Sequence, residues 1–326
     1  MALDLDEFEN NLWDRIQILN STIWENRVLK SKVDNWLSNF SQPEEKLMAL
    51  YLLSEFMYFG DSQMRILLKT LFRDLFKYPI IKEIRNLNSN TLDKLIIESK
   101  FNEELRETRF IGVGNPSESG AHLLYFFRQE NNLSKRNFIH TFEIDLPENQ
   151  NIKRIVFLDD FCGSGNQVAK DKGLISFINF IKTNRTSVEI NYLMLVGTEV
   201  GIDNIEKTGI FNNVNAVMRL DDSFKVFETN SRYFSNVDIP LVMDEVKLFA
   251  ETYGYPLTEK LCQSDGVPPV HLTACASSNS LGFSNCQLLL GFHHNTPDNT
   301  LPIIWYDEKD YPWIPIFKRY NKKYNF

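Results

Sequence analysis

The feature that most constrains the fold is a run of four apolar residues that leads directly into two adjacent carboxylates. Ile155 to Leu158 are apolar, Asp159 and Asp160 follow, and a loop with two glycines comes next. An apolar run of this length is typical of a strand that is buried on both faces of a parallel sheet. The polar loop then marks the carboxyl end of that strand, where open α/β sheets bind their ligands. The sequence therefore predicts a ligand site at residues 159–167.

Short apolar segments alternate with amphipathic segments from about residue 105 onward. Such alternation predicts an α/β fold with a mainly parallel sheet flanked by helices, as in Rossmann-like proteins. Two further strand-like segments are expected in the tail, at 288–292 and 302–306. The other strands are expected at 109–113, 138–144, 152–158, 188–196 and 216–220, and the helices at 121–129, 168–182, 201–207 and 238–262.

Residues 1–104 carry helical patterns instead. The Ser-Gln-Pro-Glu sequence at 41–44 is a typical helix start, since proline fits the first helical turn. A second helix is expected to end at Pro79, because proline cannot donate the helical hydrogen bond. We therefore expect a helical domain at 1–104, for which a winged-helix-like module is one option. An α/β domain is expected at 105–326, with a C-terminal tail from about residue 266.

Charge and composition exclude some classes of protein. The formal net charge is −8 and the isoelectric point is about 5.3, which argues against a generally basic nucleic-acid binder. A row of Lys69, Arg73 and Lys77 at helical spacing leaves direct nucleic-acid binding open, although a solvated surface is the simpler interpretation. No apolar run approaches the roughly 18 residues that a membrane span needs.

The cysteines and the start of the chain both indicate a cytoplasmic protein. The acidic start, MALDLDEFEN, lacks the apolar core of a secretory signal. The cysteines form no CxxC pair, so the simplest expectation is reduced thiols. They are Cys162, Cys262, Cys275 and Cys286.

Three familiar ligand motifs fail at the glycine loop. A Walker A loop requires a lysine after its last glycine, and this loop has none. A dinucleotide fingerprint requires a third glycine where Val168 stands, and its acidic residue follows the loop instead of preceding it. A nucleophile elbow has a GxSxG spacing that Gly163-Ser164-Gly165 does not match. Cys162 as a nucleophile would lack a histidine nearby in the sequence.

The motif that fits is the ribose-phosphate motif of type I phosphoribosyltransferases, in which four apolar residues lead to two acids and a loop with Thr and Gly. The chain resembles this pattern from Ile155 to Gln167. The resemblance implies that Asp159 and Asp160, as the catalytic acids, bind the 2′- and 3′-hydroxyls of phosphoribosyl pyrophosphate (PRPP). Asn166 and Gln167 replace the usual Gly and Thr, so the phosphate cup is more polar and bulkier than in that family. The residues that would hold the 5-phosphate are Cys162, Gly163, Ser164, Gly165, Asn166 and Gln167.

The resemblance extends over most of the chain. The helical start, the DDFCGSGNQ segment at 159–167 and the HNTPDNTLP segment at 294–302 are together similar to a phosphoribosyltransferase-like effector family of prokaryotic conflict systems. Some members of that family accompany retrons and related antiphage operons. The resemblance implies a defence toxin or effector that is held inactive until a trigger appears. It also implies a partner, either a defence-system protein or a ribonucleoprotein such as a retron complex.

Three further assignments complete the expected site. Mg²⁺ is expected with the substrate, and Asp159 and Asp160 are its expected ligands. The pyrophosphate is assigned to the loop residues Ser117, Glu118, Ser119 and Gly120 and to the basic pair Lys135 and Arg136, with a capped turn and a solvated loop as the respective alternatives. A substrate hood that recognises the acceptor is assigned to His294, Asn295, Thr296, Asn299 and Thr300, with a turn stabilised by Asn and Pro as the alternative.

These residues support one leading function and two alternatives. The leading hypothesis is an antiphage effector that binds PRPP or a ribose-5-phosphate nucleotide with Mg²⁺ and transfers or cleaves at the anomeric carbon, as a pentosyl-transferring glycosyltransferase does. The Asn166-Gln167 pair motivates a non-catalytic module that senses a nucleotide or PRPP and controls a defence partner. A hydrolase that cleaves the glycosidic bond of NAD or another nucleotide is the third hypothesis, since carboxylates beside a ribose serve that chemistry too.

Overall fold

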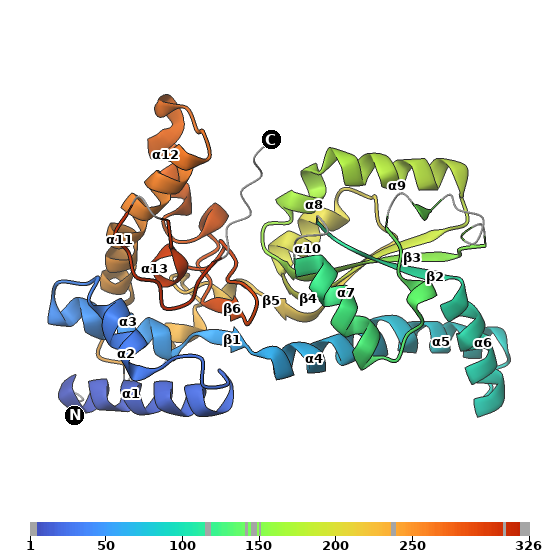
Figure 1. Cartoon of the computed structure of the whole chain (residues 1–326), viewed down its shortest axis with the longest axis horizontal. Helices are drawn as coiled ribbons and strands as arrows, with labels where there is room; N and C mark the ends of the chain where they lie inside the picture. The colour runs from blue at the N-terminus through green and yellow to red at the C-terminus, as the bar shows by residue number, and fades with distance from the viewer. Residues whose placement is uncertain are drawn as a thin grey trace. The chain divides into compact units, whose positions relative to one another are not determined.

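The computed structural model describes residues 5–114, 119–140, 143–144, 149, 151–235, 239–308 and 311–319 (Figure 1). The chain forms two compact units. One unit joins the two ends of the chain, up to Gln63 and from Asp221 onward, and the other comprises Met64–Leu220. This division differs from the expected boundary at residue 104, because helical segments after Met64 pack against the sheet.

The Met64–Leu220 unit contains a four-stranded parallel sheet. Its strands are β2 (Thr108–Gly112), β3 (Arg154–Cys162), β4 (Glu189–Thr198) and β5 (Asn213–Leu220). They are adjacent in the order β2-β3-β4-β5, and every pair is parallel. The expected α/β architecture with a parallel sheet is therefore confirmed.

Helices cover both faces of this sheet. The helical segments along this part of the chain are α4 (Asp61–Thr70), whose first turn precedes the unit, the π-helical segment η1 (Leu71–Lys77), α5 (Tyr78–Leu87), α6 (Lys94–Arg106), α7 (Ser119–Glu130), η2 (Lys135–Asn137), α8 (Asn166–Lys170), α9 (Lys172–Asn184) and α10 (Glu199–Glu206). On one face, Ile155 and Phe157 of β3 share an apolar core with α9 and α10. On the other face, Phe110 of β2 packs against Phe76 of η1 and Phe127 of α7, with ring centroids 5.1 and 5.0 Å apart. Figure 1 shows α9 and α5 on opposite sides of the strands.

Two expected elements of this unit differ from those in the structure. Pro79 does not end a helix, since α4, η1 and α5 follow one another directly and Pro79 lies in the first turn of α5. Proline is tolerated in the first turn of a helix. Pro79 occupies that position because α5 begins directly after the π-helical segment η1. The expected strand at 138–144 is reduced to Phe138, which forms an isolated parallel bridge with Phe110. Residues 141–142 lie outside the described residues.

The other unit is assembled from both ends of the chain around one apolar core. Its main elements are α1 (Leu5–Thr22), α2 (Lys30–Leu37), α3 (Pro43–Ser54), β1 (Met57–Phe59), α11 (Met243–Ser264), α12 (Pro269–Asn279), β6 (Leu290–Phe292) and α13 (Pro302–Trp305). Strands β1 and β6 form a two-stranded parallel pair. Trp24, Trp36 and Tyr306 are fully buried in the core. The helix expected after Gln42 is confirmed as α3, and Gln42 and Glu45 form a capping box at its start.

The C-terminal part of this unit corrects two expectations. Residues 302–306 are not a strand, because they contain the single helical turn α13. Cys262 of α11 and Cys275 of α12 form a disulfide. The expectation of reduced thiols is therefore wrong for this pair, whereas Cys162 and Cys286 are not disulfide-bonded. Within the described part of the chain, no helix has both the length and the apolar character that crossing a bilayer takes.

Candidate functional site

The carboxyl end of β3 lies where the chain reverses its direction across the sheet. β2 has β3 as its neighbour on one edge and Phe138 on the other, through the bridge to Phe110. From β3 the chain continues away from β2, to β4 and then β5. Open α/β sheets bind ligands at such switch points, outside the carboxyl ends of the strands. Val113 donates its N–H to the Leu158 carbonyl at 3.0 Å, so the loop that follows β2 starts beside Asp159.

The two carboxylates at the end of β3 have different surroundings. The side chains of Asp159 and Asp160 lie within hydrogen-bond reach of each other, and Asp160 Oδ1 accepts the backbone N–H of Phe161 at 2.8 Å. The hydroxyl of Tyr192, a fully buried residue of β4, donates a hydrogen bond to Asp159 Oδ2 at 2.5 Å. Asp159 Oδ1 accepts the backbone N–H of Asp160 at 2.9 Å. Both oxygens of Asp159 therefore have donors within the protein.

The environment of Asp159 and Tyr192 favours the protonated form of both side chains. Burial and the nearby Asp160 carboxylate raise the pKa of Asp159 well above its usual range, and the Tyr192 hydrogen bond opposes this rise. Burial also raises the pKa of Tyr192, and the Asp159 carboxylate adds to that rise. Asp159 is therefore suited to orienting the end of β3 and the adjacent Asp160.

The loop after β3 is held by side chains at the start of α10. The Thr198 hydroxyl donates to the Gly163 carbonyl at 2.6 Å and accepts the Gly201 N–H at 2.9 Å. The Asn204 amide donates to the Ser164 carbonyl at 3.0 Å. Two successive carbonyl groups of the loop are therefore turned toward α10.

The orientation of these carbonyls also sets the direction of two N–H groups. In a planar trans peptide the C=O and the N–H point in opposite directions, so the N–H groups of Ser164 and Gly165 point away from α10. Neither N–H has an acceptor among the residues that the structure describes, although Gly165 is buried. Buried N–H groups are nearly always paired with protein, water or ligand. Successive N–H groups of this kind form a binding site for an anion.

Glycines allow the loop and α10 to approach each other closely. A Cβ on Gly201 would lie 2.1 Å from the Gly163 carbonyl oxygen and 2.9 Å from Cys162 Sγ. Gly165 has a φ of +72°, and a Cβ there would lie 2.6 Å from the Gly201 carbonyl oxygen. The loop therefore requires glycine at 165 for its conformation and at 201 for contact.

The remaining loop residues have separate environments. The Asn166 N–H lies 3.4 Å from Ser164 Oγ, which is a weak contact. Gln167 is exposed in the first turn of α8, and Cys162 is buried at the end of β3. The structure thus brings Gly163, Ser164 and Gly165 together as a candidate cup. Phosphate binding by the other three loop residues stays a prediction.

The predicted pyrophosphate loop follows β2, whose last residues pair with Leu158 of β3. Its residues Ser117 and Glu118 lie outside the described part of the chain, and Ser119 and Gly120 begin α7. The pyrophosphate role of this segment stays a prediction.

The basic pair Lys135 and Arg136 lies at the other end of the sheet. Both residues belong to η2, whose Asn137 side chain donates to the carbonyls of Leu105 and Thr108. Thr108 is the first residue of β2, and Leu105 lies in the last turn of α6, just before that strand. The structure therefore does not bring this pair to the carboxyl ends of the strands.

The predicted hood belongs to the unit formed by the chain ends, not to the unit that contains β3. The Thr300 hydroxyl donates to the Leu290 carbonyl at 2.6 Å, and the Asn299 amide donates to the Phe283 carbonyl at 3.2 Å. Both Thr300 and Asn299 are buried, so their polar groups serve this local fold.

The other hood residues also take part in the local turn. The Asn295 side chain accepts the N–H of Thr296 at 3.0 Å, and Thr296 is buried. His294 stacks on Phe292 of β6, with ring centroids 5.7 Å apart. These contacts agree with a stabilised turn, and acceptor recognition by the hood stays a prediction.

A Mg²⁺ ion at the β3 site would depend on the substrate for most of its ligands. Among the described residues, no group of three or more His, Cys, Asp or Glu side chains could hold a metal ion. Mg²⁺ is usually bound by one or two carboxylates together with substrate phosphates, and Asp160 at the switch point fits that arrangement. Asp159 fits it less well, because both of its oxygens already accept hydrogen bonds from the protein.

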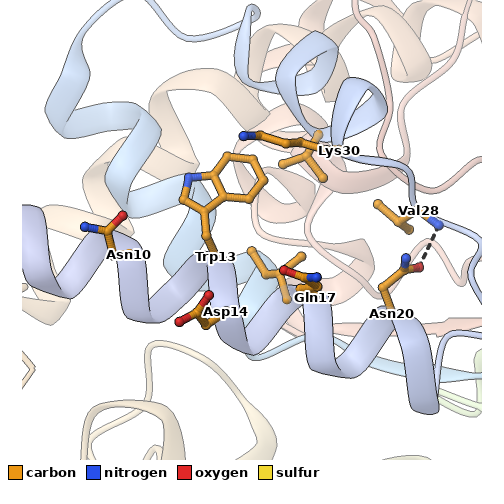
Figure 2. Close-up of a pocket in the computed structure, with 9 residues that line it drawn as sticks. Asn10, Trp13, Asp14, Gln17, Asn20, Val28 and Lys30 are labelled. Carbon is orange, nitrogen blue, oxygen red and sulfur yellow. Dashed lines mark hydrogen bonds between the residues drawn. The ribbon is translucent and has the colours of Figure 1, made fainter.

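A separate cleft of about 470 Å³ lies in the unit formed by the chain ends (Figure 2). Trp13, Gln17 and Asn20 of α1 line one side, and Val28 and Lys30 line the other. Lys30 Nζ lies 5.3 Å from the Trp13 ring centroid. None of the predicted site residues lines this cleft, which is therefore distinct from the β3 site.

Four residues that shape the β3 site were not predicted from the sequence. Thr198 had a recognisable signal, since a Thr between an apolar strand and a helix is a typical N-cap. Gly201 in the first turn of that helix was a weaker signal of close backbone approach. Tyr192 and Asn204 gave no signal in the sequence, because their hydrogen-bond partners Asp159 and Ser164 lie 33 and 40 residues away.

Comparison with known proteins identifies the family to which the chain belongs. No curated protein and no solved structure matches the chain. The family model PRTase-CE, which describes a phosphoribosyltransferase-like domain, matches residues 33–319. The matched region contains β3, the loop and α10 and covers most of the sequence. The chain therefore belongs to the phosphoribosyltransferase-like PRTase-CE family.

Proposed function

We propose that the protein binds PRPP or a ribose-5-phosphate nucleotide at the carboxyl end of β3 and transfers or cleaves at the anomeric carbon. The observation that carries this proposal is the pair of N–H groups of Ser164 and Gly165, which lack acceptors among the described residues and lie in the loop that follows Asp160. A phosphate monoester would supply those acceptor oxygens. The Asp160 carboxylate could accept hydrogen bonds from the ribose hydroxyls.

The proposed reaction breaks the bond between the anomeric carbon and the leaving oxygen of pyrophosphate. The pyrophosphate keeps the electron pair, and an acceptor N–H or O–H forms the new bond and loses its proton. Holding the sugar at its 5-phosphate and at its hydroxyls orients the anomeric carbon and lowers the entropic part of the barrier. The Asp160 carboxylate would stabilise positive charge that develops on the ring. Mg²⁺ bound with the pyrophosphate would offset the charge of the leaving group.

We further propose that this activity serves antiphage defence in the cytoplasm. A partner protein, or a ribonucleoprotein such as a retron complex, would hold the effector inactive until infection. The support is the similarity of the DDFCGSGNQ and HNTPDNTLP segments to effectors of prokaryotic conflict systems.

A pyrophosphate-release assay tests the catalytic proposal. Purified protein with Mg²⁺, labelled PRPP and extract of phage-infected cells should release pyrophosphate. Asp160→Asn removes the carboxylate charge with little change in volume and should lower the rate by about 100-fold, the usual effect of losing one electrostatic group. Lys135→Ala is the matched control, because Lys135 lies at the opposite end of the sheet.

Two results would count against this proposal. One is that the wild-type protein neither binds PRPP nor releases pyrophosphate. The other is that Asp160→Asn retains the wild-type rate.

A non-catalytic PRPP or nucleotide sensor is the second candidate function. It is favoured by the hydrogen bonds that occupy both oxygens of Asp159, which leave that carboxyl less able to serve a substrate. A sensor would be stabilised by PRPP without consuming it. Measurable turnover that Asp160→Asn abolishes would exclude this candidate.

A further inference from the structure

We infer that Thr198 and Asn204 are positioning residues that set the affinity of the loop for the 5-phosphate, an inference that rests on the proposed function. Neither side chain needs to touch the ligand. Each acts through a loop carbonyl, since Thr198 holds the Gly163 carbonyl and Asn204 holds the Ser164 carbonyl. The first turns of α10 thereby become part of the phosphate site, although they follow the next strand of the sheet.

The geometry gives each residue one peptide group to orient. The Gly163 carbonyl belongs to the same peptide unit as the Ser164 N–H, and the Ser164 carbonyl belongs to the same unit as the Gly165 N–H. Thr198 also accepts the Gly201 N–H, so its hydroxyl is fixed in direction as a donor to the loop. Without these two donors, each peptide unit could rotate and its N–H would lose its direction.

This arrangement explains how the loop can bind phosphate although Gln167 stands where type I phosphoribosyltransferases have a hydroxyl. Gln167 is exposed, so its side chain is not required to shape the cup. The Ser164 hydroxyl donates to no acceptor among the described residues and receives only the long contact from the Asn166 N–H. Two oriented N–H groups and one hydroxyl are three donors, which suit the oxygens of a phosphate monoester.

The test compares the binding of two probes, PRPP and the Mg²⁺ complex of pyrophosphate, of which only PRPP would occupy the 5-phosphate site. PRPP carries the 5-phosphate, whereas the Mg²⁺ complex of pyrophosphate lacks it. Thr198→Val and Asn204→Leu remove the donors at nearly constant volume. Each should weaken PRPP binding by about tenfold, the effect of one hydrogen bond, and leave pyrophosphate binding unchanged. Thr198→Ser restores the hydroxyl and should stay within about twofold of wild type.

The controls separate positioning from a general loss of structure. Asp203→Asn changes the exposed neighbour of Asn204 on α10 and should leave both affinities unchanged. PRPP affinities within twofold of wild type for Thr198→Val and Asn204→Leu would overturn the inference and leave the proposed function intact. Equal weakening of both probes would also overturn it, because it would indicate a purely structural role. A wild-type protein that binds no PRPP would overturn the proposed function itself.

Discussion

A methyl group at position 201 tests the close approach of the loop and α10. In Gly201→Ala the new Cβ would lie 2.1 Å from the Gly163 carbonyl oxygen and 2.9 Å from Cys162 Sγ. Contacts between carbon and oxygen normally lie beyond about 3.3 Å, so the loop must move by about 1 Å. The Thr198 hydrogen bond to that carbonyl, 2.6 Å long, cannot survive such a shift unchanged.

The expected cost follows from three contributions. Overpacking costs about 1–3 kcal/mol, and weakening the hydrogen bond to Gly163 costs about 1 kcal/mol. The better helix propensity of alanine returns up to about 1 kcal/mol. The net loss is about 2 kcal/mol of unfolding free energy, which lowers the melting temperature of a unit of this size by about 4–8 °C.

Thermal unfolding followed by near-UV circular dichroism measures this loss, and PRPP titration measures the effect on the loop. Gly173→Ala is the matched control, because a Cβ there would meet only Asp171 Oδ1, at 3.3 Å. It should leave the melting temperature unchanged or slightly higher. The reasoning would be refuted if Gly201→Ala melted within 1 °C of wild type and bound PRPP equally well.

Three further changes test the interior of the two units. Because the pKa of Asp159 is raised in the folded state, the free energy of unfolding should fall as pH rises from the ordinary Asp pKa of about 3.9 through the raised value. The stability of Asp159→Asn relative to wild type should therefore increase from pH 4 to pH 7 in denaturant titrations, and a pH-independent difference would contradict this. Tyr192→Phe removes the donor to Asp159 and should cost about 1–3 kcal/mol in a denaturant titration at pH 7, whereas an unchanged midpoint would show that the bond is not formed. Cys275→Ser, or reduction of the wild type, should cost about 3 kcal/mol because the disulfide to Cys262 closes a short loop, and a melting temperature insensitive to reductant would argue against the bond.

Local patterns were sufficient to predict the parallel sheet and the strand that ends in Asp159 and Asp160. The apolar run before Asp159 marks a strand that is buried on both faces, and this property can be read from four consecutive residues. The start of α3 at Pro43 is also determined by neighbouring residues, because the capping residue and the proline are adjacent in the sequence. Both features depend on neighbouring residues, and both were therefore predictable.

Features that depend on distant partners were not predictable in the same way. The hydrogen bond between Tyr192 and Asp159 joins two strands, and nothing in either segment alone specifies it. The disulfide between Cys262 and Cys275 requires two helices to lie together, and its spacing matches no common motif. The segment 302–306 has the composition of a strand, but the structure places a helical turn there.

The unit assembled from both chain ends has a consequence for synthesis on the ribosome. Strand β1 emerges early, but its partner β6 is made only after the whole Met64–Leu220 unit has been translated. At about 5–20 residues per second, the ribosome needs roughly 8–30 s for that intervening unit alone. During this interval apolar side chains such as Trp24, Trp36 and Leu53, which are fully buried in the finished fold, lack the C-terminal half of their core. The nascent N-terminal segment is therefore a candidate client for chaperones that bind exposed apolar chain, whereas the parallel sheet can form first.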